Sequence, residues 1–292
     1  MTKRQSKPKF TFIDLFAGIG GFHLAFHNLG GQCVFVSEWD DRARKTYEAN
    51  FKKVEPEIFK NGNFAGDITK VDAKKIPDFH ILTAGFPCQP FSNAGFKKGF
   101  ADSRGTLFHD IVRIIKEKKP DAFFLENVSH LFKHDDGKTF ATIKRIIEED
   151  LDYSFHYQIV RASDHGVPQH RARLFMVGFK NKNTPFEFPK PVKLTKTMSD
   201  IFGGKAEKTI GYTLRVGGRG SDIKDRRNWD AYMVDGKVRR LSPKEGRKMM
   251  GFPASFVFPV SDVQAMKQLG NAVAVPAIQA TAAQIVKSLQ LL

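Results

Sequence analysis

Short apolar runs alternate with amphipathic stretches of helical length from the start of the chain to about residue 180. The apolar runs predict strands, and the stretches between them have the apolar spacing of helices. Continuous apolar positions such as Phe123 and Phe124 are typical of strands buried on both faces of a sheet. Strands are expected at 11–16, 33–38, 66–68, 79–85, 122–127, 155–162 and 173–179, and helices at 22–29, 41–51, 106–118 and 137–149. This order indicates βαβ units and therefore an α/β fold with a doubly wound, mostly parallel sheet.

The pattern changes after Phe179. Residues 181–240 are rich in Lys, Arg, Gly, Asn and Pro and have no sustained period, which predicts a loop-rich second region. Helical order returns at Ser242, a good N-cap residue. Pro243 suits the first helical position and Glu245 stands where a capping-box partner belongs, so a helix is expected to begin here.

Two more helices are expected near the end of the chain. The first begins at Ser261, with Gln264 as its capping partner and Gly270 as its stop. The second covers 275–292 and is apolar enough to pack back on a folded domain.

Net charge and cysteine content restrict the class of protein. Lys and Arg outnumber Asp and Glu by 47 to 31, a net charge of +16, which favours nucleic acid as partner over a membrane. A basic surface that serves solubility alone is the alternative.

The two cysteines are too few for a disulfide framework or a four-thiolate zinc site, which fits a reducing, cytoplasmic compartment. The apolar runs look far too short to span a membrane.

A glycine-rich turn follows the first expected strand. Gly18 and Gly20 would let the backbone approach a ligand, and Glu38 lies 20 positions after Gly18, where an acidic residue can bind ribose hydroxyls. Trp39 offers an aromatic face for adenine, and Asp67 could accept from an exocyclic amine. The turn has the pattern Gly-x-Gly-Gly and no phosphate-binding lysine follows, so a nucleoside cofactor without phosphates, such as S-adenosylmethionine, fits best. Glycines that serve only a tight turn remain the alternative.

Cys88 follows another expected strand and stands between Pro87 and Pro90. A zinc or redox role would require a second cysteine in a Cys-x-x-Cys pattern, which this loop lacks, and no metal site is expected. Cys33, inside a strand, is interpreted as a core residue. A Pro-restricted polar loop at a strand's carboxyl end favours a nucleophile at Cys88. The basic, glycine-dotted stretch 92–105 could be a lid over a polyanion.

Glu126 ends a further expected strand, at the same sheet edge as Cys88. An apolar wall there could raise its pKa towards use as a general acid; a capping or ion-pairing glutamate is the alternative. Arg171 and Arg173 alternate along one face, so one could act on Cys88 or on a carbonyl oxygen and the other could hold Glu126. A nucleophilic thiol, a protonatable carboxyl and a methyl donor together suit methylation of cytosine at C5, on a base flipped out of its duplex.

The chain resembles the bacterial DNA (cytosine-5) methyltransferases of restriction–modification systems. The motifs that carry the resemblance run in the family's order from about Phe12 to Pro276: FIDLFAGIGGFHLAF, SEWD, GDIT, GFPCQPFS, DSRGTLF, FFLENV, QHRARLFMVG, RRLSPKEGRKMMGFP and QLGNAVAVP. The resemblance implies a Rossmann-like S-adenosylmethionine-dependent methyltransferase fold. It also implies a catalytic and cofactor-binding domain over 1–180, a small target-recognition domain over 181–262, and a C-terminal segment, 263–292, that returns to the catalytic domain.

The resemblance also assigns roles to particular residues. It implies Cys88 as nucleophile, Glu126 as the partner of cytosine N3, and Arg171 and Arg173 as active-site arginines. The residues it places around S-adenosylmethionine are Phe16, Gly18, Gly20, Glu38, Trp39, Asp67, Ile68, Pro87, Leu107 and Asn271.

Two features depart from the family pattern. The stretch 180–240 is short for a target-recognition domain, and Ala94 stands where related enzymes often carry Ser. The short region keeps a Thr213-Leu214 pair, and DNA contacts are expected after it. The candidates for contacts with guanine edges or phosphates are Thr213, Arg215, Arg219, Arg226 and Arg227, together with Ser92 and Arg104 in the cysteine loop; phosphate contact is the more frequent role.

The main interpretation is therefore a monomeric methyltransferase for a specific double-stranded DNA sequence, paired with a restriction endonuclease that it need not touch. A tRNA cytosine-C5 methyltransferase is the close alternative. A catalytically silent DNA-binding relative is disfavoured because Cys88, Glu126 and both arginines are present.

Overall fold

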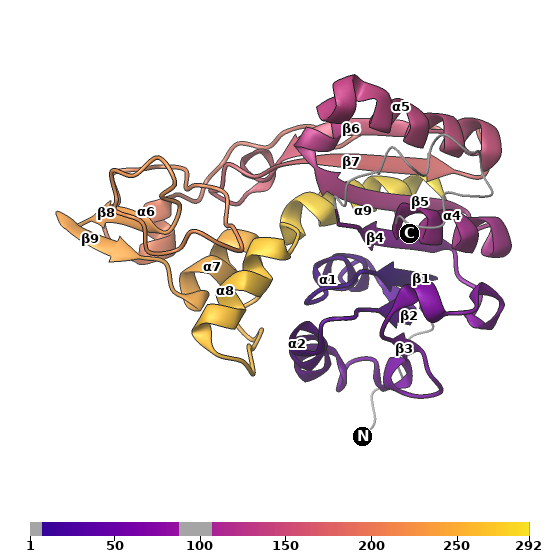
Figure 1. The fold of residues 1–292 in the computed structure, drawn as a ribbon, viewed down its shortest axis with the longest axis horizontal. Helices are drawn as coiled ribbons and strands as arrows, with labels where there is room; N and C mark the ends of the chain where they lie inside the picture. The colour runs from indigo at the N-terminus through magenta and orange to yellow at the C-terminus, as the bar shows by residue number, and fades with distance from the viewer. Residues whose placement is uncertain (1–7, 88–106, 292) are drawn as a thin grey trace.

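A seven-stranded sheet forms the larger lobe of the molecule (Figure 1). The structure, a computed structural model, describes residues 8–87 and 107–291. The strands are β1 (Phe10–Leu15), β2 (Gly31–Ser37), β3 (Phe64–Ala65), β4 (Ile81–Gly85), β5 (Ala122–Val128), β6 (His156–Arg161) and β7 (Ala172–Phe179). Their order across the sheet is β3-β2-β1-β4-β5-β7-β6. β1 to β5 pair in parallel and β7 runs antiparallel to both its neighbours, so the expected mostly parallel sheet is confirmed.

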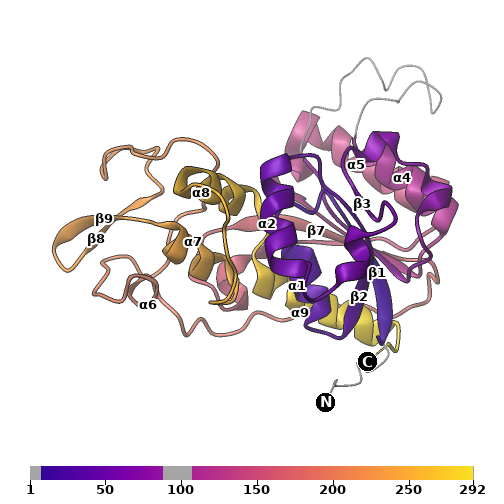
Figure 2. The ribbon, with the colours of Figure 1, turned by 90° about the horizontal axis from the view of Figure 1, so that it is seen from below.

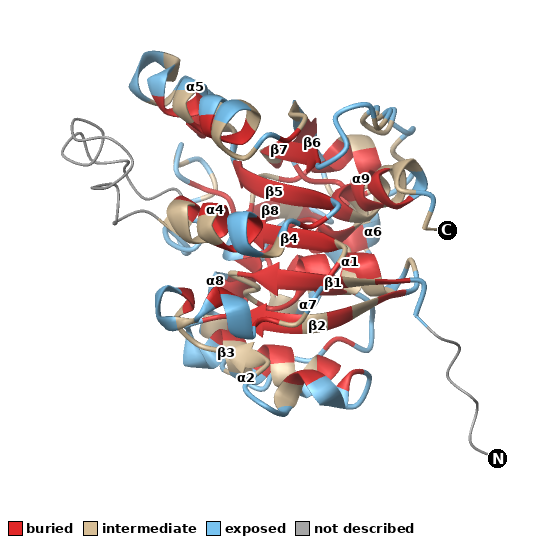
Figure 3. Cartoon of the chain, turned by 90° about the vertical axis from the view of Figure 1, so that its right-hand side faces the viewer, coloured by how far each residue is buried: buried red, intermediate tan, exposed pale blue. Residues whose placement is uncertain are grey.

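Alternating side chains along each strand build a core on both faces of the sheet. In β5, Ala122 and Phe124 pack in one apolar cluster, whereas Phe123 and Leu125 pack in the other. The helices α1 (Gly21–His27), α2 (Asp41–Phe51) and α9 (Val275–Ser288) cover the first face, and α4 (Leu107–Lys118) and α5 (Lys138–Arg145) cover the second. The exposed residues of α2, α4 and α5 point away from the buried strands (Figure 3).

Local capping signals decide several element boundaries. α2 coincides with the predicted helix 41–51, because the Asp40 carboxylate accepts from the amides of Arg42 and Ala43. The predicted strand at 66–68 is wrong. The strand ends at Ala65, and the Asp67 carboxylate accepts from the amide of Thr69, a side-chain-to-backbone bond that caps a short 3₁₀ turn instead.

The smaller lobe contains α6 (Met198–Phe202), the hairpin of β8 (Ala231–Val234) and β9 (Lys237–Arg240), α7 (Pro243–Met250) and α8 (Asp262–Asn271). The hairpin lies at the end of this lobe remote from the sheet (Figures 1 and 2). The sequence analysis predicted loops here and missed both α6 and the hairpin. Asp235 and Gly236, both with positive φ, form the two-residue turn and were the available signal.

The two predicted capped helices of this lobe had different outcomes. The capping box between Ser242 and Glu245 is confirmed at α7. At α8, no side-chain capping bond from Ser261 occurs within the described residues, and the helix runs past Gly270 to Asn271. Gly270 is required for close approach rather than as a stop, since a Cβ there would lie 2.5 Å from the carbonyl carbon of Arg215.

The C-terminal stretch Asp262–Ser288 is long and apolar enough to cross a membrane, contrary to the expectation from the sequence. In the structure it consists of two helices, α8 and α9, separated at 272–274. Of its most apolar window, 61% is buried inside the protein, so both helices serve the core.

Candidate active site

Four parallel strands place the predicted site residues at one edge of the sheet. β1, β2 and β4 end there and continue into Phe16, Glu38 and Phe86 respectively, and β5 ends there at Val128. The carboxyl edge of such a sheet is where ligands of α/β proteins bind.

The glycine turn after β1 is tied directly to Glu38. Phe16, Gly18 and Gly20 all have positive φ, and the Gly18 amide donates to Glu38 Oε2 over 2.7 Å. Among the described residues, nothing lies within 4 Å of a Cβ placed on Gly18, so the turn borders open space there. A Cβ on Gly20 would lie 2.3 Å from the Phe51 ring, so that glycine is needed for packing.

Glu38 is buried but keeps capacity for a ligand. Burial raises its pKa, and the amides of Asp40 and Gly18 partly offset this by donating to its two oxygens. Each carboxylate oxygen has a second lone pair that ribose hydroxyls could use. Trp39 beside it is 76% exposed, which leaves its indole face available for stacking.

Asp67 and Ile68 form the next part of this edge. Ile68 is buried, and Arg113 anchors the turn by donating to the carbonyl oxygens of Ile68 and Val71. Asp67 is half-buried, and its Oδ1 accepts from Thr69 while Oδ2 lies 3.8 Å from Lys70 Nζ. Acceptors, an aromatic face and a buried apolar side chain suit a nucleoside better than a phosphate group.

The C-terminal segment returns to the same turn. Gln268 of α8 accepts from the Thr46 hydroxyl of α2 and donates to the Arg42 carbonyl, each over 2.9 Å. A Cβ on Gly21 would lie 2.6 Å from Val273, so the backbone of α1 directly contacts this segment. Asn271 lies exposed between Gln268 and Val273. Leu107, half-buried, begins α4 on the other face of the sheet.

Glu126 lies near the end of β5 and is buried, with 8% of its surface exposed. Its Oε1 accepts from Arg173 Nε over 2.9 Å, so the expectation that one of the two arginines holds Glu126 is confirmed for Arg173. Burial raises the pKa of Glu126, and Arg173 and Arg171 partly offset this. Glu126 pairs with Gly85, where a Cβ would lie 3.6 Å from Glu126 Oε2; the carboxyl group therefore lies over the strand that leads to Pro87.

Arg171 has a different environment from Arg173. It borders the same small cavity beside Glu126, with room for about one water molecule. Its guanidinium, however, donates to the backbone carbonyls of Leu214, Gly270 and Ala272. Burial lowers its pKa to about 9. These contacts join the segment just before β7, the start of the smaller lobe and the C-terminal segment.

Some of the predicted DNA-contact residues bind other groups of the protein, whereas others have exposed side chains. Arg219 lies 3.5 Å from the buried Asp230 and donates to the Leu241 carbonyl, and the Thr213 hydroxyl donates to the His170 carbonyl. Arg227 pairs with Asp225 over 2.7 Å but stays largely exposed. Arg215 and Arg226 are exposed and form no ion pair within the described residues.

Several predicted residues are outside the described residues: Cys88, Ser92, Ala94 and Arg104. Pro87, which precedes Cys88, is described and exposed at the carboxyl edge.

Asn127 and Gln169 position parts of the site, although the motifs that contain them predicted no role for either. Asn127 Nδ2 donates to the Phe86 carbonyl over 3.0 Å, which fastens the end of β5 to the start of the cysteine loop. Gln169 is fully buried, donates to the Met249 carbonyl and accepts from the Leu214 amide, so it holds the smaller lobe beside β7. Asn127 directly follows Glu126 in the FFLENV motif and Gln169 precedes Arg171 by two positions in QHRARL, and an amide inside each motif was the available signal.

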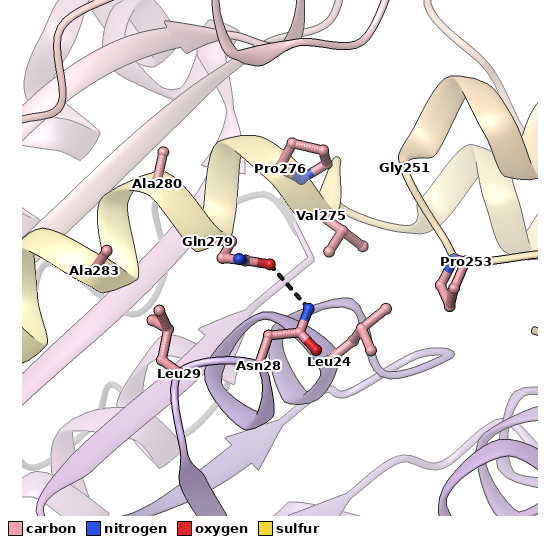
Figure 4. Close-up of a pocket in the computed structure, with 10 residues that line it drawn as sticks. All are labelled: Leu24, Asn28, Leu29, Gly251, Pro253, Val275, Pro276, Gln279, Ala280 and Ala283. Carbon is pink, nitrogen blue, oxygen red and sulfur yellow. Dashed lines mark hydrogen bonds between the residues drawn. The ribbon is translucent and has the colours of Figure 1, made fainter. Parts of the chain in front are cut away.

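A larger groove of about 540 Å³ lies between α1, α9 and the loop after α7 (Figure 4). Leu24, Val275 and Pro276 line it, and Asn28 Nδ2 donates to Gln279 Oε1 across it over 2.9 Å. None of the predicted site residues lines this groove, so its size does not mark the active site.

The family model of C-5 cytosine-specific DNA methylases matches residues 10–216 and 213–287. The chain is 44% identical to the Type II methyltransferase M.HpaII of Haemophilus parainfluenzae over 97% of this chain and 91% of the relative. It is 41% identical to M.HhaI of Haemophilus parahaemolyticus over 95% and 94% of the two chains.

Structural comparison agrees at the level of the fold. The S. pombe Dnmt2 methyltransferase superposes with a TM-score of 0.73 at 18% identity, covering 96% of this chain and 99% of its own. The family match and the two relatives together show that the chain belongs to the C-5 cytosine-specific DNA methylases.

Proposed function

We propose that this cytosine-5 methyltransferase attacks C6 of its target base with Cys88 and supplies a proton to N3 from Glu126. The observation that carries the proposal is the placement of Glu126. Its carboxyl group is buried and held by Arg173. Glu126 pairs with Gly85 of β4, the strand that leads directly to Pro87 and Cys88.

The chemistry explains why both groups are needed. C5 of cytosine is a weak nucleophile, so the ring must first be activated. Addition of the Cys88 thiolate forms a bond to C6, and the electron pair displaced from the C5–C6 double bond is stabilised when N3 accepts a proton from Glu126. The resulting enamine is nucleophilic at C5. After methylation, loss of the C5 proton and expulsion of the thiolate restore the aromatic ring and free the enzyme.

The carboxyl edge fits S-adenosylmethionine, the methyl donor of this enzyme class. When bound, S-adenosylmethionine supplies an electrophilic methyl group. We assign the ribose to Glu38, the adenine ring to Trp39 and the neighbouring contacts to the open turn at Gly18. Asp67, Ile68, Leu107 and Asn271 complete the proposed site. Because the base must reach this edge, it has to leave the DNA stack first.

DNA recognition is assigned to residues 181–262. Arg215 and Arg226 are exposed and free of ion pairs within the described part of the chain, so they are the first candidates for DNA contact. Arg219 is better interpreted as a residue that holds the lobe together through Asp230.

The relatives are named Type II methyltransferases, which supports a restriction–modification role. We propose that the protein acts as a monomer in the cytoplasm of a bacterium. We further propose that it protects DNA from an endonuclease that recognises the same sequence without binding the methyltransferase.

The direct test uses duplex DNA with 5-fluorocytosine at the target position, which bisulfite sequencing of a co-expressed plasmid would first identify. With S-adenosylmethionine present, the wild-type chain should form a covalent adduct that survives denaturation, because the fluorine cannot leave as the C5 proton does. Cys88→Ser should form none, should lose methylation by at least about 10³-fold, and should still bind DNA. Methylation of tRNA but not of duplex DNA would contradict the proposal, as would turnover by Cys88→Ser.

A further inference from the structure

A cluster of two histidines and one glutamate lies on the face of α1 that packs towards β2 and α2. His23 and His27 are four positions apart, so their imidazoles lie on the same side of the helix. Glu55, just before a 3₁₀ turn at Pro56–Phe59, reaches both: its Oε2 lies 3.4 Å from His23 Nε2 and its Oε1 lies 2.9 Å from His27 Nδ1. All three ligand atoms lie within 4.8 Å of one another.

The second observation is the buried, unpartnered nitrogen of His23. The His23 side chain is fully buried, and its Nε2 has no hydrogen-bond partner in the described structure although it faces Glu55. Leaving a buried nitrogen without a hydrogen bond is unfavourable, so a buried atom of this kind is expected to have a partner. Its other nitrogen, Nδ1, hydrogen-bonds the Tyr47 hydroxyl, which fixes the ring with Nε2 directed at the cluster. Metal-binding histidines are typically oriented in this way.

The Glu55 carboxylate is buried and has a fixed position in the cluster. The Cys33 amide donates to Glu55 Oε2 over 3.0 Å and holds the carboxylate in place.

We propose that His23, His27 and Glu55 form a binding site for a divalent transition-metal ion of the zinc type. Two imidazoles and one carboxylate are a common ligand set for Zn²⁺, with a fourth position left for water. Metal–ligand bonds of about 2.0–2.1 Å place tetrahedral ligands roughly 3.4 Å apart. The His23–Glu55 separation already has that value, and the His27–Glu55 contact must open by roughly 0.5 Å. His27 is 39% exposed, so solvent can reach the fourth position.

The ion would be structural. It would fasten α1, which begins directly after the glycine turn, to Glu55 and thereby to β2. The cysteine-based search of the sequence could not reveal this site, because its ligands are histidines and a carboxylate from separate elements.

The test compares zinc binding by three tag-free proteins: the wild type, His27→Gln and His130→Ala. Glutamine at 27 can still donate a hydrogen bond to Glu55 but is a poor zinc ligand, so it separates metal binding from the His–Glu hydrogen bonds. His130 is exposed on the segment after β5 and serves as the matched control. Each chain is stripped with chelator, dialysed and titrated with Zn²⁺ by calorimetry, and its Tm is measured with and without zinc. Co²⁺ serves as the spectroscopic probe.

We expect the wild type and His130→Ala to bind one additional equivalent of Zn²⁺ compared with His27→Gln. Their Tm should rise by about 5 °C at 100-fold excess of zinc over Kd. Co²⁺ should give visible ligand-field bands of a four-coordinate site in these two chains. Equal zinc binding by the wild type and His27→Gln would overturn the proposal, as would a wild-type Tm unmoved by zinc. A control by circular dichroism establishes that all three are folded; if His27→Gln is not, Glu55→Gln takes its place with the same expected loss.

Discussion

Two aspartates with no exposed surface, Asp14 in the sheet and Asp230 in the smaller lobe, are accommodated in opposite ways. Asp14 accepts from the Thr83 hydroxyl over 3.1 Å and from the His23 amide over 3.2 Å, both neutral donors. Burial raises its pKa to about 8, despite those two bonds. Asp230 instead lies 3.0 Å from Arg240 and 3.5 Å from Arg219.

The difference shows how each lobe achieves its shape. The sheet is enclosed by apolar side chains on both faces. A carboxyl group buried there is stabilised by remaining protonated and not by pairing with a cation. The smaller lobe has a two-stranded hairpin and few regular elements, so ion pairs around Asp230 hold its loops together. Arg219 and Arg240 are therefore used for internal pairing, and the exposed arginines of this lobe are the ones proposed to contact DNA.

The largest expected effect is on catalysis by the sheet lobe, and it should leave DNA binding by the smaller lobe unchanged. Glu126→Gln removes the proposed acid but keeps the shape of the side chain, so kcat should fall by about 10²–10⁴-fold. DNA affinity, measured by fluorescence anisotropy, should change little. A comparable loss of DNA affinity would show that Glu126 contributes to binding rather than to the chemical step.

Asp230→Asn tests the ion pairs of the smaller lobe. Loss of the carboxylate leaves Arg219 and Arg240 without their buried partner, and we expect a loss of about 3 kcal/mol in the free energy of unfolding of this lobe. Urea denaturation followed by the fluorescence of the buried Trp229 would measure it. Asp225→Asn, which removes the exposed pair with Arg227, is the control and should leave the transition unchanged. Equal transitions for the two variants would refute this account of the lobe.

Asp14 predicts a pH dependence for the sheet. Between its unfolded pKa, near 3.8, and its folded value of about 8, the native state holds a proton that the unfolded chain has lost, so stability falls as pH rises. His23, whose pKa is lowered by burial, acts in the opposite direction mainly below the ordinary histidine pKa of 6.5. From pH 6.5 to 8 the wild type should therefore lose about 2 kcal/mol relative to Asp14→Asn, which cannot titrate. Parallel stability curves for the two proteins in that range would contradict the shifted pKa.

The smallest effect concerns a single DNA contact. Arg226→Ala should weaken DNA binding a few-fold and reduce the salt dependence of binding by about one ion, because one phosphate contact is lost. Arg145→Ala, in the sheet lobe on α5, should leave both quantities unchanged. Equal effects of the two substitutions would mean that the basic surface acts through net charge alone.

Local signals made much of the fold predictable. Asp40 and Ser242 mark helix starts through side-chain bonds within three residues, so the sequence is sufficient there. The failures at Asp67 and Gly270 have one physical origin. The local pattern predicted a strand at Asp67 and a helix stop at Gly270. A different contact decides the structure at each: Asp67 caps a short turn, and Gly270 lies against the backbone of Arg215.

The candidate site was predictable in its residue types but not in its pairings. Arg171 and Arg173 are equivalent in the sequence pattern. The antiparallel pairing of β7 with β5 places Arg173 opposite Val128 and within reach of Glu126. Arg171 precedes the strand and binds carbonyls from segments 43 to 101 positions away. Such long-range pairings depend on the whole topology, which periodicity does not encode.

The contact between α1 and α9 has a consequence for synthesis of the enzyme. Val273 packs on Gly21, and Gln279 bonds Asn28, so the helix after the glycine turn is covered by a segment that is translated after the whole sheet. A nascent chain that has completed the whole sheet still exposes this face of α1. We therefore expect the methylase to become competent only after α9 has left the ribosome, so that a nascent chain with a completed sheet is still inactive.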